Sequence, residues 1–200
     1  IEFTTSGKQC HGSRPDEGKN ACLAASHLAV ELNRELKAAF NNKDALFTPD
    51  YSTFEPTMRK ANVDGVNIIP GSDVMYMDCR ILPCYSCEEV LVKVEEICKK
   101  IEINFGVKIT YKLLQKAQSV ATPKDAKVVQ LLSQALKDTH GIESKIIGIG
   151  GGTVGAELRN HGYNCVVWGT LDECAHMPNE YCIIDNIIKD AETLAVLMSK

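Results

Sequence analysis

His176 lies in the stretch DECAHMPNEY, residues 172–181, in which carboxylates and a proline surround a histidine. An imidazole among carboxylates is the ligand chemistry of zinc, which takes three or four protein ligands. Asp172 and Glu180 could join His176 at helical spacing only in a continuous helix, and Pro178 interrupts such a helix. We therefore expect the other ligands of His176 to lie in polypeptide that this chain does not contain.

His11 lies in the segment GKQCHGSRPDEGKNA, residues 7–21, which is rich in glycine, serine and proline. This segment connects a predicted strand to a predicted helix, and such connections carry function more often than packing. A functional role for His11 and a merely solvated histidine are both consistent with this position.

Arg80 belongs to residues 73–82, whose side chains alternate between two faces of a predicted strand. One face carries Met75 and Met77, and the other carries Asp78 and Arg80. If the methionines face the helices, the guanidinium of Arg80 stands on the opposite face, where it could bind a carboxylate through two hydrogen bonds. An ion pair with Asp78 is the alternative, and the pattern favours neither.

The segment IIGIGGGTVGAELRN, residues 146–160, leads from a glycine turn into a predicted helix. The backbone N–H groups of such a turn could bind an anion or an oxyanion, and a purely structural tight turn is the alternative. The segment matches a dinucleotide-binding fingerprint only in part, because Thr153 occupies the position of the last glycine. We therefore expect no bound nucleotide.

The nine cysteines are irregularly spaced, which predicts reduced thiols and a cytoplasmic protein. Cys84 and Cys87 form a CxxC pair at the start of a predicted helix, where a thiolate would be favoured. No second pair is present to complete a structural zinc site, so we expect both cysteines to serve packing. The remaining histidines fall in or at the ends of predicted helices and are expected to be structural or solvated: His27, His140 and His161.

Composition narrows the class of protein. The 200 residues are 44% hydrophobic and 24% charged, as in an ordinary soluble globular protein. A formal net charge of -4 offers no basic face for nucleic acid. No apolar run approaches the roughly 18 residues that a membrane span requires. These features predict no nucleic acid and no membrane, and favour a small molecule or another protein as partner.

Hydrophobic periodicity predicts the elements of the first part of the chain. They are a strand over 1–10, a helix over 18–39, a strand over 46–58, a strand over 73–82, a helix over 87–105 and a strand over 107–113. Pro49 and Pro56 favour an edge position for the second strand. The order βαββαβ is that of a ferredoxin-like fold.

The second part of the chain predicts a piece of a parallel sheet. Its elements are a helix over 123–139 with Thr122 as cap and Pro123 first, a strand over 145–149, a helix over 154–160, a strand over 164–168 and a helix over 180–199. Both strands are almost continuously apolar, as strands buried on both faces are, and two strands cannot supply that environment. We expect this chain to be the C-terminal portion of a longer enzyme; a small complete α/β domain is the alternative.

Four motifs in this order, GKQCHGSRPDEGKNA, VNIIPGSDVMYMDCRILP, GIGGGTVGAELRNHGY and AHMPNEY, resemble a family of zinc-dependent metallopeptidases and deacylases. The family includes aminoacylase, acetylornithine deacetylase, succinyl-diaminopimelate desuccinylase and glutamate carboxypeptidase. The resemblance implies an α/β protein with a ferredoxin-like lid and dimerisation domain over residues 1–117. Residues 118–200 would then be the C-terminal segment of the catalytic zinc hydrolase domain.

The resemblance also implies the chemistry. Members hydrolyse an amide bond of N-acyl amino acids or short peptides with two zinc ions, or cobalt or manganese, as homodimers joined through the lid. His176 resembles the last metal ligand, and the other ligands would be absent, so this chain alone is expected to be inactive. A non-catalytic dimerisation or small-ligand-binding module is the alternative.

The same resemblance assigns further roles. His11 is similar to the histidine that reaches across the dimer to the tetrahedral oxyanion. Asn67 and Arg80 resemble the residues that hold the carboxylate and carbonyl of the substrate. Gly152 and Thr153 resemble the backbone cradle of the substrate.

Overall fold

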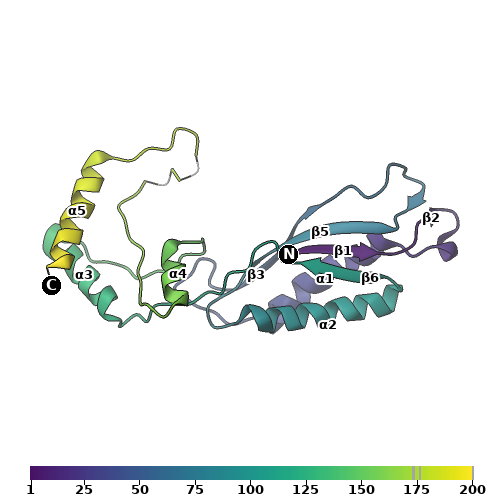
Figure 1. The fold of residues 1–200 in the computed structure, drawn as a ribbon, viewed down its shortest axis with the longest axis horizontal. Helices are drawn as coiled ribbons and strands as arrows, with labels where there is room; N and C mark the ends of the chain where they lie inside the picture. Colours follow the sequence, from purple (N-terminus) through teal and green to yellow (C-terminus); the bar gives the residue numbers. More distant parts are fainter. Residues whose placement is uncertain (173, 176, 200) are drawn as a thin grey trace. The chain divides into compact units, whose positions relative to one another are not determined.

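The computed structural model describes residues 1–172, 174–175 and 177–199. Two compact units divide the chain, Ile1–Ser119 and Val120–Lys200, and each has its own helices (Figure 1). Within the described ranges, no helix is long and apolar enough to cross a membrane.

The first unit is a four-stranded antiparallel sheet with two helices on one face (Figure 1). Its main elements are β1 (Glu2–Ser6), α1 (Ala21–Ala39), β3 (Thr53–Arg59), β5 (Ser72–Arg80), α2 (Cys87–Phe105) and β6 (Lys108–Lys112). The strand order is β3-β5-β1-β6. This is the ferredoxin-like βαββαβ arrangement that the sequence predicts.

A separate two-stranded ribbon pairs β2 (Cys10–His11) with β4 (Ile68–Ile69). The strand predicted over 1–10 is therefore divided in two. The division follows Gly7, where a Cβ atom would stand only 2.1 Å from the carbonyl oxygen of Lys19. Because this backbone contact leaves no room for a side chain, the chain can turn here only with glycine.

Both helices of the first unit begin at polar caps. The Asn20 side chain accepts a hydrogen bond from the Leu23 N–H at the start of α1. At the start of α2, Ser86 and Glu89 form a capping box, and Gly106 ends the helix in the left-handed conformation at φ 64°. Caps of this kind satisfy the N–H groups that a helix leaves without an internal partner. The bounds predicted for α2 are confirmed.

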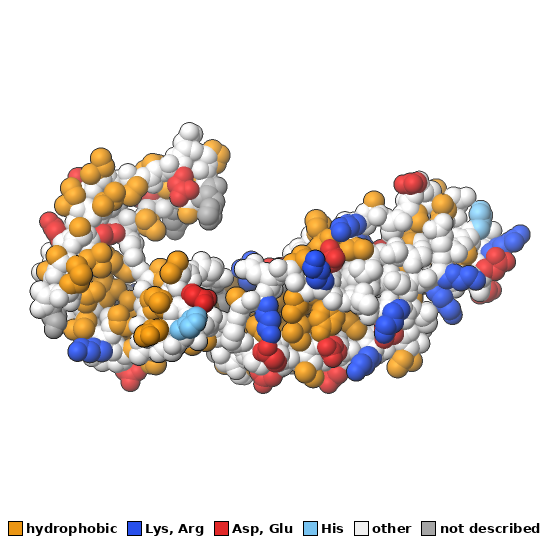
Figure 2. Space-filling model, viewed as in Figure 1, with side chains coloured by type: hydrophobic (Ala, Val, Ile, Leu, Met, Phe, Trp, Pro, Cys, Tyr) orange, Lys and Arg blue, Asp and Glu red, His pale blue; other side chains and the backbone are white. Residues whose placement is uncertain are grey.

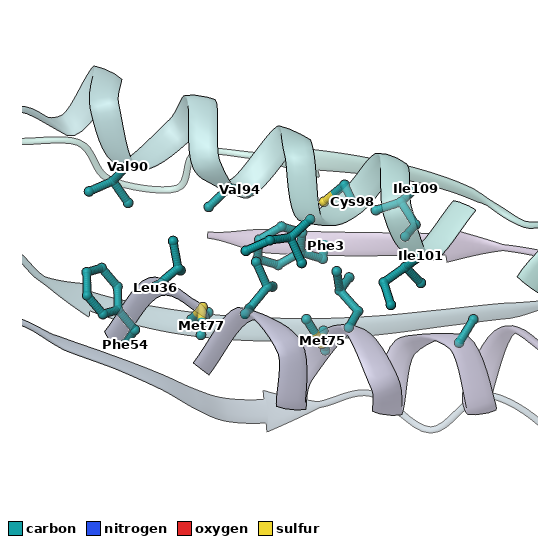
Figure 3. Close-up of a cluster of buried hydrophobic side chains, with 14 of the residues drawn as sticks. Phe3, Leu36, Phe54, Met75, Met77, Val90, Val94, Cys98, Ile101 and Ile109 are labelled. Carbon is teal, nitrogen blue, oxygen red and sulfur yellow. The ribbon is translucent and has the colours of Figure 1, made fainter. Parts of the chain in front are cut away.

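The core of the first unit fills the space between the sheet and the helices (Figure 3). Phe3 of β1 is fully buried, and Met75 and Met77 of β5 are 2% and 3% exposed. The methionine side of β5 thus faces the helices, as the alternation predicts. β3 lies at the sheet edge, which agrees with Pro56 within it, although the strand begins later than predicted.

The second unit contains three helices in the part of the chain that the structure describes: α3 (Lys127–His140), α4 (Val154–Asn160) and α5 (Ile184–Met198). α3 and α5 pack together, and the buried hydroxyl of Thr193 lies 3.3 Å from Thr139 Oγ1 and 3.1 Å from His140 Nε2. The bounds predicted for α4 are confirmed, and α5 is shorter than predicted.

The start predicted for α3 is wrong. The helix begins at Lys127, after Ala126, and Pro123 instead accepts the Ala126 N–H in a turn at 3.0 Å. The hydroxyl of Thr122 donates to the carbonyl oxygen of Cys165 at 2.6 Å and accepts the Cys165 N–H at 3.1 Å. Since both hydrogen bonds go to Cys165, Thr122 does not cap the helix.

The strands predicted over 145–149 and 164–168 are also wrong, because the structure assigns no strand to either segment. A strand is maintained by a ladder of hydrogen bonds to a neighbour. Ile146, Ile147 and Val167 are 42%, 61% and 47% exposed. An apolar pattern alone therefore does not form a strand, because it does not supply a pairing partner.

Candidate functional site

The β2–β4 ribbon brings two of the predicted site residues together. His11 pairs with Ile68 across the ribbon, and the Gly12 N–H donates to the carbonyl oxygen of Asn67 at 2.7 Å. As a result, the side-chain nitrogen Nδ2 of Asn67 lies 3.3 Å from Nε2 of His11. Both side chains are exposed. An imidazole and a carboxamide thus share one accessible surface.

Ser13 indicates which ring nitrogen of His11 carries the proton. The Ser13 backbone N–H donates to Nδ1 at 3.2 Å, so Nδ1 acts as an acceptor. In the neutral imidazole the proton then resides on Nε2, which faces Asn67. The oxygen and nitrogen of an asparagine side chain can exchange places by rotation, so the Asn67 oxygen can accept this Nε2–H. Sequence reasoning missed Ser13, whose only signal is its position two residues after the histidine.

Arg80 lies on the sheet face opposite the helices, at the end of β5. Its Nε donates to Asp78 Oδ2 at 2.7 Å, and this ion pair raises the pKa of the guanidinium. The pair that the sequence leaves as an alternative is therefore formed, while 61% of the Arg80 side chain remains exposed.

The two halves of the predicted substrate site stand far apart within one chain. β5 runs from Ser72 to Arg80 and contains nine residues, and β4 precedes its Ser72 end. At a rise of about 3.3 Å per residue, the two ends of such a strand are roughly 26 Å apart. The structure therefore brings His11 and Asn67 together and does not bring Arg80 to them.

The glycine turn lies before α4. A Cβ atom on Gly150, Gly151 or Gly152 would meet no atom within 4 Å, so no close packing within the described chain requires glycine there. Thr153 is the N-cap of α4, but its side chain makes no capping hydrogen bond, and its buried Oγ1 has no hydrogen-bond partner among the described residues.

His176, predicted as a metal ligand, lies outside the described residues. A small hollow is lined by Asp172, Cys174, Glu180 and Tyr181, among others. A hydrogen bond from Tyr181 to Asp172 raises the pKa of the phenol. Within the described chain, no three His, Cys, Asp or Glu side chains converge as a metal site. The described residues do not by themselves fit a metal centre.

The packing role predicted for the CxxC pair is confirmed for Cys87 and wrong for Cys84, which is exposed. Cys87 is buried, and burial is the main cause that raises the pKa of its thiol, followed by the charge of Glu88. Its Sγ contacts the carbonyl oxygen of Ala117 at 3.7 Å. A raised pKa disfavours the thiolate that redox chemistry needs.

Comparisons with curated proteins identify similar chains. An uncharacterized metallohydrolase of Methanocaldococcus jannaschii is 41% identical over 96% of this chain and 49% of its own length. A succinyl-diaminopimelate desuccinylase of Nitratiruptor is 26% identical over 87% of this chain and 45% of its own length. The chain spans about half the length of the curated relatives it matches.

Solved structures confirm the α/β fold class. A tripeptidase of Staphylococcus aureus matches with a TM-score of 0.74 at 18% identity, over 98% of this chain and 49% of that chain. An M20 family metallo-carboxypeptidase of Sulfolobus solfataricus matches with a TM-score of 0.67 at 17% identity, over 98% of this chain and 57% of that chain. Residues 1–105 match the family model described as a peptidase dimerisation domain. The chain therefore belongs to the family of M20 peptidase dimerisation domains.

Proposed function

We propose that the protein containing this chain is a cytoplasmic homodimer that hydrolyses an amide bond of an N-acyl amino acid or short peptide with the help of two zinc ions. The observation that carries this proposal is the exposed pair of His11 and Asn67, 3.3 Å apart, on a domain of the M20 dimerisation family. The names of the relatives, metallohydrolase and desuccinylase, favour the same class of reaction.

His11 is the proposed oxyanion donor. Hydrolysis of an amide passes through a tetrahedral intermediate whose oxygen carries negative charge, and a preorganised N–H directed at that oxygen lowers the barrier. With Nδ1 accepting the Ser13 N–H, the neutral ring presents Nε2–H for this purpose. Before substrate binds, the Asn67 oxygen can accept the same hydrogen, so the donor is oriented in advance.

Arg80 is the proposed carboxylate anchor. Its planar guanidinium can hold a carboxylate through two hydrogen bonds. Because Arg80 and His11 lie towards opposite ends of β5, a strand roughly 26 Å long, one small substrate cannot touch both in the same chain. We propose that one subunit supplies Arg80 and its partner supplies His11 and Asn67 to each site.

The outer face of α1 is the proposed dimer surface. Leu23 and Val30 are 49% and 63% exposed there, in one stripe with His27 and Arg34. The exposed face of α2 is instead crowded with charges: Glu88, Glu89, Glu95, Glu96, Lys99 and Lys100. α1 also packs over the edge strand β3. A twofold axis would place the same stripe and the same edge on both subunits.

His176 is proposed as one zinc ligand, with further ligands supplied outside the described residues. The metal would polarise the carbonyl and activate water. Residues 118–200 would belong to the catalytic domain, with Gly152 and Thr153 offering backbone groups to the substrate. This chain alone is proposed to be inactive.

The test uses the full-length protein, with zinc content and hydrolysis of N-acyl amino acids as readouts. His11→Ala should lower kcat about a hundredfold without loss of zinc, since it removes an oxyanion donor. His176→Ala should lose both zinc and activity. His161→Ala is the control, because among the described residues this exposed histidine contacts Glu157, one helical turn before it. Full activity in His11→Ala would contradict the proposal.

A further inference from the structure

A buried carboxylate lies at the base of the segment that carries Asn67. The Asp73 side chain is 0% exposed. Its Oδ1 accepts from Arg59 Nε at 2.8 Å, and its Oδ2 accepts from Asn62 Nδ2 at 2.7 Å. The hydrogen bond from Asn62 closes residues 62–73 into a loop, and Asn67 lies in the middle of that loop.

The partner of this carboxylate is itself fixed in place. Arg59 ends β3, and its two terminal nitrogens donate to Ser26 Oγ at 3.1 Å and to the carbonyl oxygen of Cys22 at 2.9 Å. Asp73 is thereby tied to the first turns of α1 as well as to the sheet. A buried charge that is paired and hydrogen-bonded in this way resists displacement, because moving Arg59 leaves the carboxylate without its counter-charge and moving Asn62 leaves one of its oxygens without a donor.

The returning arm of the loop is bound through its backbone. The carbonyl oxygens of Gly71, Pro70 and Asn67 accept from the N–H groups of Gly7, Ala21 and Gly12 at 2.8, 3.0 and 2.7 Å. The first arm of the loop, which leads from β3 through Asn62, is held more by side chains. In the described structure, Lys60 N–H donates to the Val74 carbonyl oxygen at 3.0 Å, and the Asn62 carboxamide then joins this arm to Asp73.

We propose that Asp73, acting through Arg59 and Asn62, is a positioning residue that holds Asn67 against the imidazole of His11. This inference rests on the proposed function, in which His11 supplies the oxyanion donor. Asp73 touches no substrate. Asp73 instead restricts the loop to the conformation in which the Asn67 carboxamide lies 3.3 Å from Nε2 of His11.

The test is a double-mutant cycle in the full-length protein. Asp73→Asn would remove the counter-charge of Arg59 and place a neutral amide at a fully buried position, which disturbs the fold itself, so Asn62→Ala is the informative variant. We expect it to lower kcat about tenfold with KM nearly unchanged, because small displacements of a catalytic group have effects of this size. In an Asn67→Ala background the same substitution should have no further effect on kcat.

Asn33→Ala is the matched control. Its carboxamide donates to the Phe54 carbonyl oxygen at 2.6 Å, so this substitution also removes an asparagine side-chain hydrogen bond from the first unit. Thermal unfolding and molar mass should be alike for the two variants, while kcat falls only for Asn62→Ala. Equal kcat values, or an Asn62→Ala effect that persists in Asn67→Ala, would overturn the positioning role.

A second readout does not depend on hydrolysis. In this 200-residue chain, nitrogen NMR of labelled histidine should show His11 as the Nε2–H tautomer. The His11 signals are assigned as those that disappear in His11→Ala. Asn62→Ala should change or broaden the His11 signals, and Asn33→Ala should not. If the full-length wild-type protein is inactive but the His11 signals change in Asn62→Ala, the proposed function is wrong and the positioning role stands. Unchanged His11 signals in Asn62→Ala would defeat the positioning role.

Discussion

The two units of this chain differ in where their large apolar side chains lie. In the first unit, α1 and α2 cover one face of a four-stranded sheet, and side chains from both layers fill the core between them. In the second unit, apolar side chains remain at the surface over α4 and α5 (Figure 2). Val154, Ile184 and Met198 are 82%, 72% and 80% exposed.

The difference teaches what holds each kind of element together. A helix closes its hydrogen bonds within one segment, so α4 and α5 form with an apolar face open. A strand closes its hydrogen bonds only with a neighbour, so the apolar segments 145–149 and 164–168 form no strand, whereas each strand of the first unit has a partner. The close approach of His11 and Asn67 likewise depends on paired strands, β2 and β4.

The largest expected effect is on the core of the first unit. Phe3→Ala should lower the free energy of unfolding of that unit by about 3–5 kcal/mol, because it leaves a cavity around a fully buried ring. Ile187→Ala in α5, where the side chain is 54% exposed, should change the free energy of unfolding of the second unit by about 0.5 kcal/mol or less. Urea unfolding measures both, and equal losses would remove the contrast between the units.

The next effect concerns the apolar side chains that the first unit leaves exposed. Val30→Asp on α1 should convert the dimer to monomer, because it buries a charge in the proposed interface. Val92→Asp on α2 is matched to it, since the two valines are 63% and 60% exposed. Analytical ultracentrifugation distinguishes the states. A dimer that survives Val30→Asp, or dissociates in Val92→Asp, would place the interface elsewhere.

Changes to helix caps should alter the stability of the two units by a smaller amount. Ser86→Ala removes the capping box of α2 and should destabilise that helix by about 1 kcal/mol. α5 begins after Ile183 with no side-chain cap, so Ile183→Ser should stabilise it by up to about 1 kcal/mol. Amide hydrogen exchange of each helix reports both changes. No gain in α5 would mean that local capping does not limit the second unit.

The smallest expected effect is electrostatic. Lys100 donates to Glu35 at 2.9 Å across α1 and α2 and is the main cause that lowers the pKa of this carboxyl to about 2 from its usual 4.5. Since the folded state holds this proton less tightly than the unfolded state, the pair stabilises the fold above pH 4.5, and this contribution is lost as pH falls towards 2.

Glu35→Gln measures that contribution. The difference in unfolding free energy from wild type should be about 1 kcal/mol at pH 6, because the pair is partly solvent-screened, and should shrink at pH 3. A difference that is independent of pH would show that the ion pair does not act through the charge of Glu35.

Much of the first unit could be predicted from the sequence. The bounds of α2 follow from its apolar stripe and from Ser86 and Gly106 at its ends, signals that lie within the segment itself. The face of Arg80 follows from strand alternation. The break at Gly7 could not be predicted, because it depends on the Lys19 carbonyl oxygen, which approaches only in the folded chain.

The candidate site was only partly predictable. His11 was identifiable from its loop, but Asn67 came from the family resemblance, since no local signal marks it. Their proximity depends on the pairing of β2 with β4, and short strands of two residues leave little periodicity to read. The separation of Arg80 from both depends on the direction and length of β5, which no single motif contains.

The central claim is that His11 of one subunit and Arg80 of the other complete each active site. Mixing inactive His11→Ala and Arg80→Ala full-length proteins under exchange conditions tests it most directly. Half of the dimers would be mixed and each would contain one intact site, so activity should recover to about a quarter of wild type. No recovery on mixing, with exchange demonstrated, would contradict the claim, because a site that combines His11 of one subunit with Arg80 of the other would then not exist.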